Sequence, residues 1–124
     1  MSKKNNKGFT LMEMLIVVAI IAVLVAIATP VLTSQLEKAR DSADAANLRA
    51  QYAEMAAEAL EAKEDRTSEG VEIAGKTAGF GNVEDIAGVS TSDDGVLSTA
   101  KDGDTITVTV SASTGKATFN KVTN

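Results

Sequence analysis

The sequence predicts an α+β protein in which a long N-terminal α-helix packs on a small antiparallel β-sheet. Three observations predict this fold: residues 9–32 are almost entirely apolar, residues 33–69 are rich in Ala and charge without Gly or Pro, and residues 70–124 hold most of the Gly and Thr. A basic leader with three Lys residues, 1–8, precedes them. We therefore expect a leader, an apolar helix, an amphipathic helix and a β head with these boundaries.

The composition excludes several classes of function. The chain has 124 residues without Cys, His or Trp, and 12 basic against 17 acidic residues for a net charge of −5. No thiol nucleophile, imidazole base, zinc site or disulfide is therefore available. The acidic balance argues against direct binding of nucleic acid, which needs phosphate neutralisation. We therefore expect that the chain is not an enzyme and that it has neither a catalytic residue nor a cofactor.

Residues 33–69 predict an amphipathic helix that continues the apolar helix, since Pro30 is the only helix breaker between Phe9 and Glu69. Apolar side chains recur there at spacings of three and four and share a face. This stripe consists of Leu36, Ala39, Ala43, Ala46, Ala50, Ala53, Ala57 and Leu60, widened by Leu48, Tyr52, Met55 and Ala59. We expect the sheet to pack on the stripe, because the C-terminal segment is too short to sustain a core alone.

Residues 104–112 alternate strictly between apolar and polar side chains, which predicts a half-buried strand. Its apolar face consists of Ile106, Val108, Val110 and Ala112. A turn at residues 113–115 leads into a second strand at residues 116–122 and brings Phe119 near that face.

The rest of the head has weaker patterns. We expect a further strand at residues 95–99 and one short helical turn at residues 83–87. The acidic residues at 93–94 and 102–104 have the composition of turns and lack the spacing of a calcium loop, so we expect no metal site.

The apolar segment is long enough to cross a membrane. As a helix, residues 9–32 would span about 36 Å, against a hydrocarbon core of about 30 Å. The Lys residues before it place the leader in the cytoplasm. A secretory signal cleaved after Ala28, in the A-x-A sequence at residues 26–28, is one interpretation. A simple single-span anchor is the second.

A third interpretation rests on particular residues. A carboxylate inside an apolar run costs several kcal/mol unless it is paired, so Glu13 is unexpected in a plain signal peptide. The segment KGFTLMEMLIVVAIIAVLVAIATPVL, residues 7–32, resembles the class III signal of the type IV pilin family. The resemblance implies that a prepilin peptidase cleaves after Gly8 and that Phe9 becomes the methylated N-terminus. Glu13 then matches the acid at the fifth mature position, and Pro30 matches the helix-distorting proline.

The resemblance also implies a function. The precursor would be anchored in the cytoplasmic membrane by residues 9–32 and then polymerised by the pilus assembly machinery into an extracellular helical filament, a homo-oligomer that serves cell adhesion and motility. Glu13 of one subunit would pair with the Phe9 amine of its neighbour and fix the register. The alternatives are a pseudopilin of a secretion or competence system and a small secreted or anchored binding module.

Two further features of the apolar segment concern helix packing. Pro30 lacks an N–H group and clashes with the carbonyl group of Ala26, so it should kink or loosen the helix. Ala19, Ala22 and Ala26 place small side chains on one helix face, where neighbouring helices could approach closely.

Overall fold

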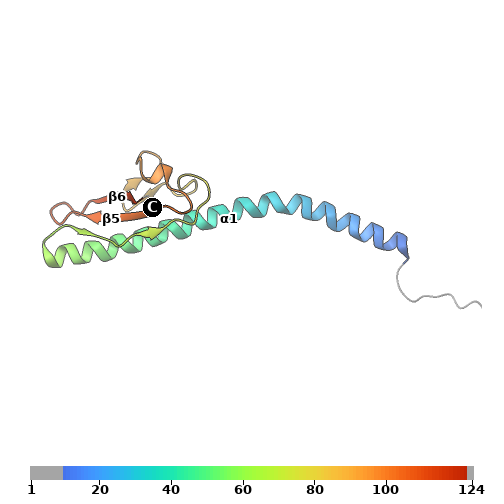
Figure 1. Ribbon diagram of the computed structural model, residues 1–124, viewed down its shortest axis with the longest axis horizontal. Coiled ribbons are helices and arrows are strands. Elements are labelled where there is room, and N and C mark those ends of the chain that lie inside the picture. The colour runs from blue at the N-terminus through green and yellow to red at the C-terminus, as the bar shows by residue number, and fades with distance from the viewer. Residues whose placement is uncertain (1–9, 123–124) are drawn as a thin grey trace, which may run out of the picture. The chain divides into compact units, whose positions relative to one another are not determined.

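The computed structural model describes residues 10–122, which form one long helix followed by a small β head (Figure 1). The chain divides into two compact units, Met1–Gln35 and Leu36–Asn124. In the second unit, an antiparallel sheet packs on the C-terminal part of helix α1 (Leu11–Ala62). The predicted α+β fold of a long N-terminal helix on a small antiparallel sheet is confirmed.

Helix α1 ends at Ala62, earlier than the expected helical segment of residues 33–69. Lys63 has a φ of 58°, which is left-handed and ends the helix in the way typical of a residue after a helix C-terminus. The expected end is therefore wrong. Part of the remainder forms strand β1 (Arg66–Thr67), which pairs with the sheet. No Gly or Pro marks this end, so composition alone did not reveal it.

The main sheet is built around strand β5 (Thr105–Val110). Strand β6 (Ala117–Val122) pairs with β5 antiparallel along one edge, in a register that places Phe119 opposite Val108. Along the other edge lie β1 and the equally short β2 (Val71–Glu72). The two long strands confirm the sequence prediction, whereas two-residue strands are too short to produce an alternating pattern.

The expected helical turn at residues 83–87 is wrong. A small hairpin occupies this segment, formed by β3 (Asp85–Ile86) and β4 (Val89–Ser90). The two residues between them, Ala87 and Gly88, both have positive φ, at 53° and 79°. That geometry is required by the tight two-residue turn of a twisted hairpin.

The expected strand at residues 95–99 is wrong as well. The structure has a 3-10 helix, η1 (Leu97–Thr99). The Asp94 carboxylate accepts the N–H groups of Val96 and Leu97, both at 2.9 Å. Such a local bond from a side chain to the backbone competes with strand pairing and folds the chain back on itself.

The core lies between the sheet and one face of α1. The helix contributes Ala45, Leu48, Met55 and Ala59, and the sheet contributes Ile106, Val108, Val110 and Phe119. The eight residues of the predicted apolar stripe, from Leu36 to Leu60, are instead all exposed. The four residues that were expected only to widen the stripe are the ones that pack against the sheet, namely Leu48, Tyr52, Met55 and Ala59. Both faces carry apolar residues at helical spacing. The larger side chains of Leu48 and Met55 decide which face is buried, because they fill the space beneath the sheet.

Candidate functional site

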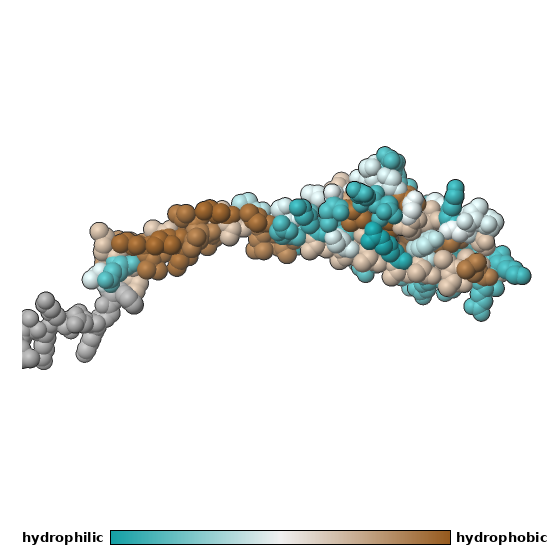
Figure 2. Space-filling model, turned by 180° about the vertical axis from the view of Figure 1, so that it is seen from behind, coloured by the Kyte–Doolittle hydropathy of each residue, from teal (hydrophilic) through white to brown (hydrophobic). Residues whose placement is uncertain are grey.

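The N-terminal part of α1 exposes a continuous apolar surface. Its large apolar side chains over residues 11–32 are between 46% and 81% exposed. Figure 2 shows this surface as the brown part of the helix. By length and composition, α1 is able to cross a membrane. Apolar surface of this extent is unfavourable in water, so it requires lipid or another protein as its partner.

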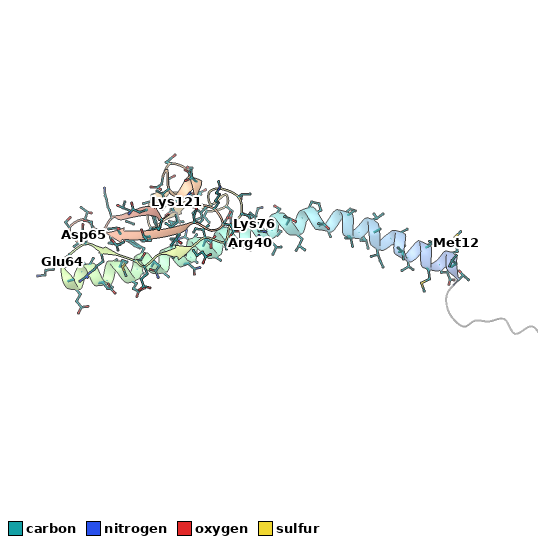
Figure 3. The ribbon with its side chains drawn as sticks, in the orientation of Figure 1. Met12, Arg40, Glu64, Asp65, Lys76 and Lys121 are labelled. Atoms are coloured by element: carbon teal, nitrogen blue, oxygen red, sulfur yellow. The ribbon has the colours of Figure 1, made fainter. Side chains whose placement is uncertain are left out.

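The polar groups of Thr10 and Glu13 meet at the start of this helix. The Thr10 N–H donates to Glu13 Oε2 at 3.0 Å, and the Glu13 N–H donates to Thr10 Oγ1 at 3.3 Å. This reciprocal pair is a capping box, which satisfies two N–H groups that have no partner within a helix. Met12, which lies between them in the sequence, is labelled in Figure 3 and marks this end of α1. Glu13 was a predicted site residue, whereas Thr10 was missed, although its T-x-x-E spacing is a known sequence signal.

The other residues expected to act in processing and packing fall into two groups. Gly8 and Phe9 lie outside the described residues. Ala19, Ala22 and Ala26 lie on α1 and are exposed, and their spacing of three and four residues places them on one helix face.

Helix α1 continues through Pro30. The Thr29 hydroxyl donates to the Val25 carbonyl oxygen at 2.7 Å, and the Thr33 hydroxyl donates to the Thr29 carbonyl oxygen at 3.0 Å. Hydroxyl groups that bond back to the preceding turn satisfy backbone acceptors and favour bending of a helix. The two hydroxyls thus flank the one place in the apolar segment where proline removes a backbone donor.

In the head, acidic side chains of α1 hold a loop that the sequence did not mark. Asp44 Oδ2 accepts the N–H groups of Ala74 and Gly75 at 3.0 and 2.9 Å. Glu37 Oε1 accepts the N–H and the hydroxyl group of Thr77 at 2.7 and 2.9 Å. A Cβ atom on Gly75 would lie only 2.6 Å from Asp41 Oδ1, so a larger residue at this position would force the Asp41 side chain to move.

These contacts shift the pKa values of two helix carboxyls in opposite directions. Burial, followed by the nearby charge of Glu37, raises the pKa of Asp41. The hydrogen bond from the Thr77 N–H lowers the pKa of Glu37. Just before β5, the hydrogen bond from Lys121, with Nζ 2.8 Å from Oδ2, lowers the pKa of Asp104. Within residues 10–122, no group of three or more acidic side chains is arranged to hold a metal ion.

The long helix with its exposed apolar part fits insertion of the precursor into a membrane, and a small β head follows the helix. Residues 3–29 match the family model described as the prokaryotic N-terminal methylation motif, which is the class III signal of type IV pilins and pseudopilins. This motif belongs to structural pilin-type proteins and not to an enzyme family. No curated protein and no solved structure matches the chain at a significant level. The match covers residues 3–29 alone, so it shows that this segment is similar to the N-terminal signal of type IV pilins and pseudopilins.

Proposed function

We propose that the chain is the structural subunit of a type IV pilus filament. The observation that carries the proposal is the apolar part of α1, which is exposed along its length and lies largely within the residues that match the methylation motif. The motif and this helix fit a membrane-anchored precursor that is processed by a prepilin peptidase. In the proposed filament, the helices of neighbouring subunits replace lipid around these side chains.

Cleavage after Gly8 would leave the amine of Phe9 as a positive charge beside an apolar segment, and the family methylates this amine. In lipid or in a filament core, this amine and the Glu13 carboxylate are both costly unless they pair. Pairing between Glu13 of one subunit and Phe9 of the next neutralises both charges. It also sets the axial register, since a subunit out of register leaves both charges unpaired.

Two surfaces of α1 suit close packing between copies. Ala19, Ala22 and Ala26 form a small-residue face in the apolar segment, where backbones can approach closely. In the head unit, the outer Ala face consists of Ala39, Ala43, Ala46, Ala50, Ala53 and Ala57, all exposed. Pro30 would let the helix loosen locally as subunits pack.

The filament surface follows from the charge left after processing. Cleavage of the leader removes three of the 12 basic residues and none of the 17 acidic ones, so the net charge of the side chains changes from −5 to −8. We therefore expect an acidic, soluble filament that does not bind nucleic acid without help.

Intact-mass and N-terminal sequence analysis of protein from its native cells tests the proposal. A chain that begins at Phe9 and is one methyl group heavier than its sequence supports pilin-type processing, and electron microscopy then separates long pili from short pseudopilus fibres. A chain that begins at Thr29 would be an ordinary secreted domain. One that begins at Met1 would be a simple anchor. Either of these two results overturns the proposal.

A further inference from the structure

The head contains two Asp-Gly pairs, Asp94-Gly95 and Asp102-Gly103. Because glycine has no side chain, nothing crowds the nitrogen that follows the aspartate in such a pair. This nitrogen is able to attack the carboxyl carbon of the aspartate side chain and to close a succinimide ring. Whether the ring closes in a folded protein depends on what holds the two reacting groups, and the two pairs differ in this respect.

The carboxylate of Asp94 is fixed at the start of η1. Its Oδ1 accepts the N–H groups of Val96 and Leu97, both at 2.9 Å. The carbonyl oxygen of Asp94 accepts the N–H of Ser98, also at 2.9 Å. Ring closure rotates both the side chain and the main chain at Asp94, so it would break these three bonds. Backbone donors would lose their acceptors, and this cost opposes the reaction.

The carboxylate of Asp102 has no such contacts. The residue is exposed, and among residues 10–122 its side chain accepts no hydrogen bond and forms no ion pair. It lies in a tight turn that is closed by a 3.0 Å bond from the Asp104 N–H to the Lys101 carbonyl oxygen. The attacking nitrogen is held by one bond, from the Gly103 N–H to the Ile73 carbonyl oxygen at 3.2 Å. This bond is at the long end of the normal range, so ring closure meets less opposition here than at the other pair.

We propose that Asp102 is a site of self-modification, where the aspartate converts into isoaspartate through a succinimide, and that the fold protects Asp94. The Gly103 nitrogen forms a bond to Cγ of the protonated Asp102 carboxyl, and the hydroxyl group leaves with the N–H proton as one water molecule. Water then opens the ring. Attack at the Cγ carbonyl restores aspartate, whereas attack at the main-chain carbonyl leaves the chain running through Cβ and Cγ with a free α-carboxylate. The reaction needs neither an oxidant nor a cofactor, and it does not depend on the proposed function.

The modification would change how the turn holds the loop after β2. The Asp102 N–H donates to the Gly75 carbonyl oxygen at 2.6 Å, and the Gly103 N–H donates to the Ile73 carbonyl oxygen. Isoaspartate adds one methylene group to the main chain between these two donors, so the two bonds can no longer form with their present spacing. Asp44 holds the same loop from the helix side. The modified head would therefore keep the attachment of the loop to α1 and loosen its attachment to the turn.

The first measurement is peptide mapping of the full chain in detergent after prolonged incubation in buffer. Cleavage after Glu84 leaves residues 85–124 as one peptide, because no further Glu follows, and this peptide contains both Asp-Gly pairs. Electron-transfer fragmentation distinguishes isoaspartate from aspartate at each position, although their masses are equal. We expect isoaspartate to accumulate severalfold faster at Asp102 than at Asp94. Equal rates, or a faster reaction at Asp94, overturn the proposal.

The same incubation in urea tests whether the fold causes the difference. Once the head unfolds, Asp94 loses its bonds to Val96 and Leu97, and both pairs are left with the same Asp-Gly chemistry. We expect the two rates to converge, mainly through a faster reaction at Asp94. If Asp94 stays as slow in urea as in the folded chain, its protection does not come from the fold, and the proposal is overturned.

Asp102→Glu is the matched variant for the effect on the loop. It keeps the carboxylate at an exposed position, and the larger ring that it would have to form closes far more slowly. Amide hydrogen exchange of residues 101–104 is compared in fresh and aged chains. We expect severalfold faster exchange in aged wild type and no change in aged Asp102→Glu. Unchanged exchange in wild type that carries isoaspartate, or equal acceleration in both chains, overturns the loosening of the turn.

Discussion

Asp44 holds Gly75 through a 2.9 Å hydrogen bond from the Gly75 N–H group to carboxylate oxygen Oδ2, and both residues are buried. The same oxygen accepts the N–H of Ala74 at 3.0 Å. One helix side chain thereby supplies the acceptor for two successive backbone donors in a loop that has no strand partner at these positions. This bond attaches the loop after β2 to α1.

Replacing Asp44 by Ala is therefore expected to destabilise the head by about 2–4 kcal/mol, because two backbone donors lose their acceptor and that of Gly75 is buried. Asp44→Asn keeps one acceptor oxygen and should lose less. Urea unfolding of the detergent-solubilised chain, followed by circular dichroism, measures both. The exposed Glu54→Ala serves as the control, with a change within about 0.5 kcal/mol. An equally small change in Asp44→Ala would show that the loop does not depend on this bond.

Truncating Phe119 to Ala is expected to cost about 3–5 kcal/mol, because its ring is buried between β5, β6 and the helix and would leave a cavity. Val122→Ala, at an exposed position on the same strand, is the control and should change the unfolding free energy little. Thermal melting of the two variants provides the comparison. The same melting temperature for both would place Phe119 outside the core.

The pH dependence of stability tests the buried acid on α1. Burial raises the pKa of Asp41, so its charged form costs stability near neutral pH, and this cost disappears as the pH falls through the raised pKa. Asp41→Asn is therefore expected to stabilise the head at about pH 7, with an advantage that shrinks toward about pH 4. Urea unfolding at a series of pH values measures this change.

Asp104→Asn provides the control of opposite sign. The hydrogen bond from Lys121 lowers the pKa of Asp104. The stability that the charged Asp104 contributes to the head is therefore complete above the ordinary pKa of aspartate and is lost as the pH falls through the lowered pKa. This variant should be less stable than the wild type at neutral pH, and the difference should vanish in acid. An advantage of Asp41→Asn that stays constant with pH would refute the role of burial.

Ala45 and Ala46 are consecutive residues of α1, the first fully buried and the second exposed. Ala45→Leu is expected to destabilise the head by about 1–3 kcal/mol through overpacking. Ala46→Leu should leave the stability of the head unchanged. It should lower filament yield, since it places a bulky side chain on the outer Ala face, where we propose that copies approach closely. Unfolding measurements and electron microscopy test the pair together. Normal filaments from Ala46→Leu would exclude this face from close packing.

Glu13→Ala is expected to be cleaved and inserted in the membrane but to assemble poorly, because the neighbouring amine loses its partner. Membrane fractionation and intact mass measure insertion and cleavage, and electron microscopy measures assembly. Glu13→Asp is the matched control, because it keeps the negative charge on a shorter side chain. Normal filaments from Glu13→Ala would remove the argument from charge pairing.

Local sequence patterns were sufficient to predict the elements that have a characteristic composition or periodicity of their own. The helix composition, the strict alternation around Val108 and the spacing of Glu13 and Pro30 after the basic leader are all properties of short segments. They correctly predicted the long N-terminal helix, though not its C-terminal end, the pairing of β5 with β6 and the methylation motif. Such signals survive without knowledge of distant contacts, since each reflects propensity or periodicity within a few turns or residues.

The tertiary structure decided which helix face is buried and what holds the loops. The periodicity of Ala46 and its stripe is as regular as that of Leu48 and its neighbours, so only the fit of large side chains beneath the sheet chose between the faces. The bonds from Asp44 and Glu37 join residues at least 30 positions apart in sequence, and β1 and β2 exist only because β5 offers an edge. The sequence by itself thus determined the helix, the hairpin and the N-terminal signal. Packing between distant segments determined the orientation of the helix under its sheet, because burial is a property of the whole assembled core and not of any one segment.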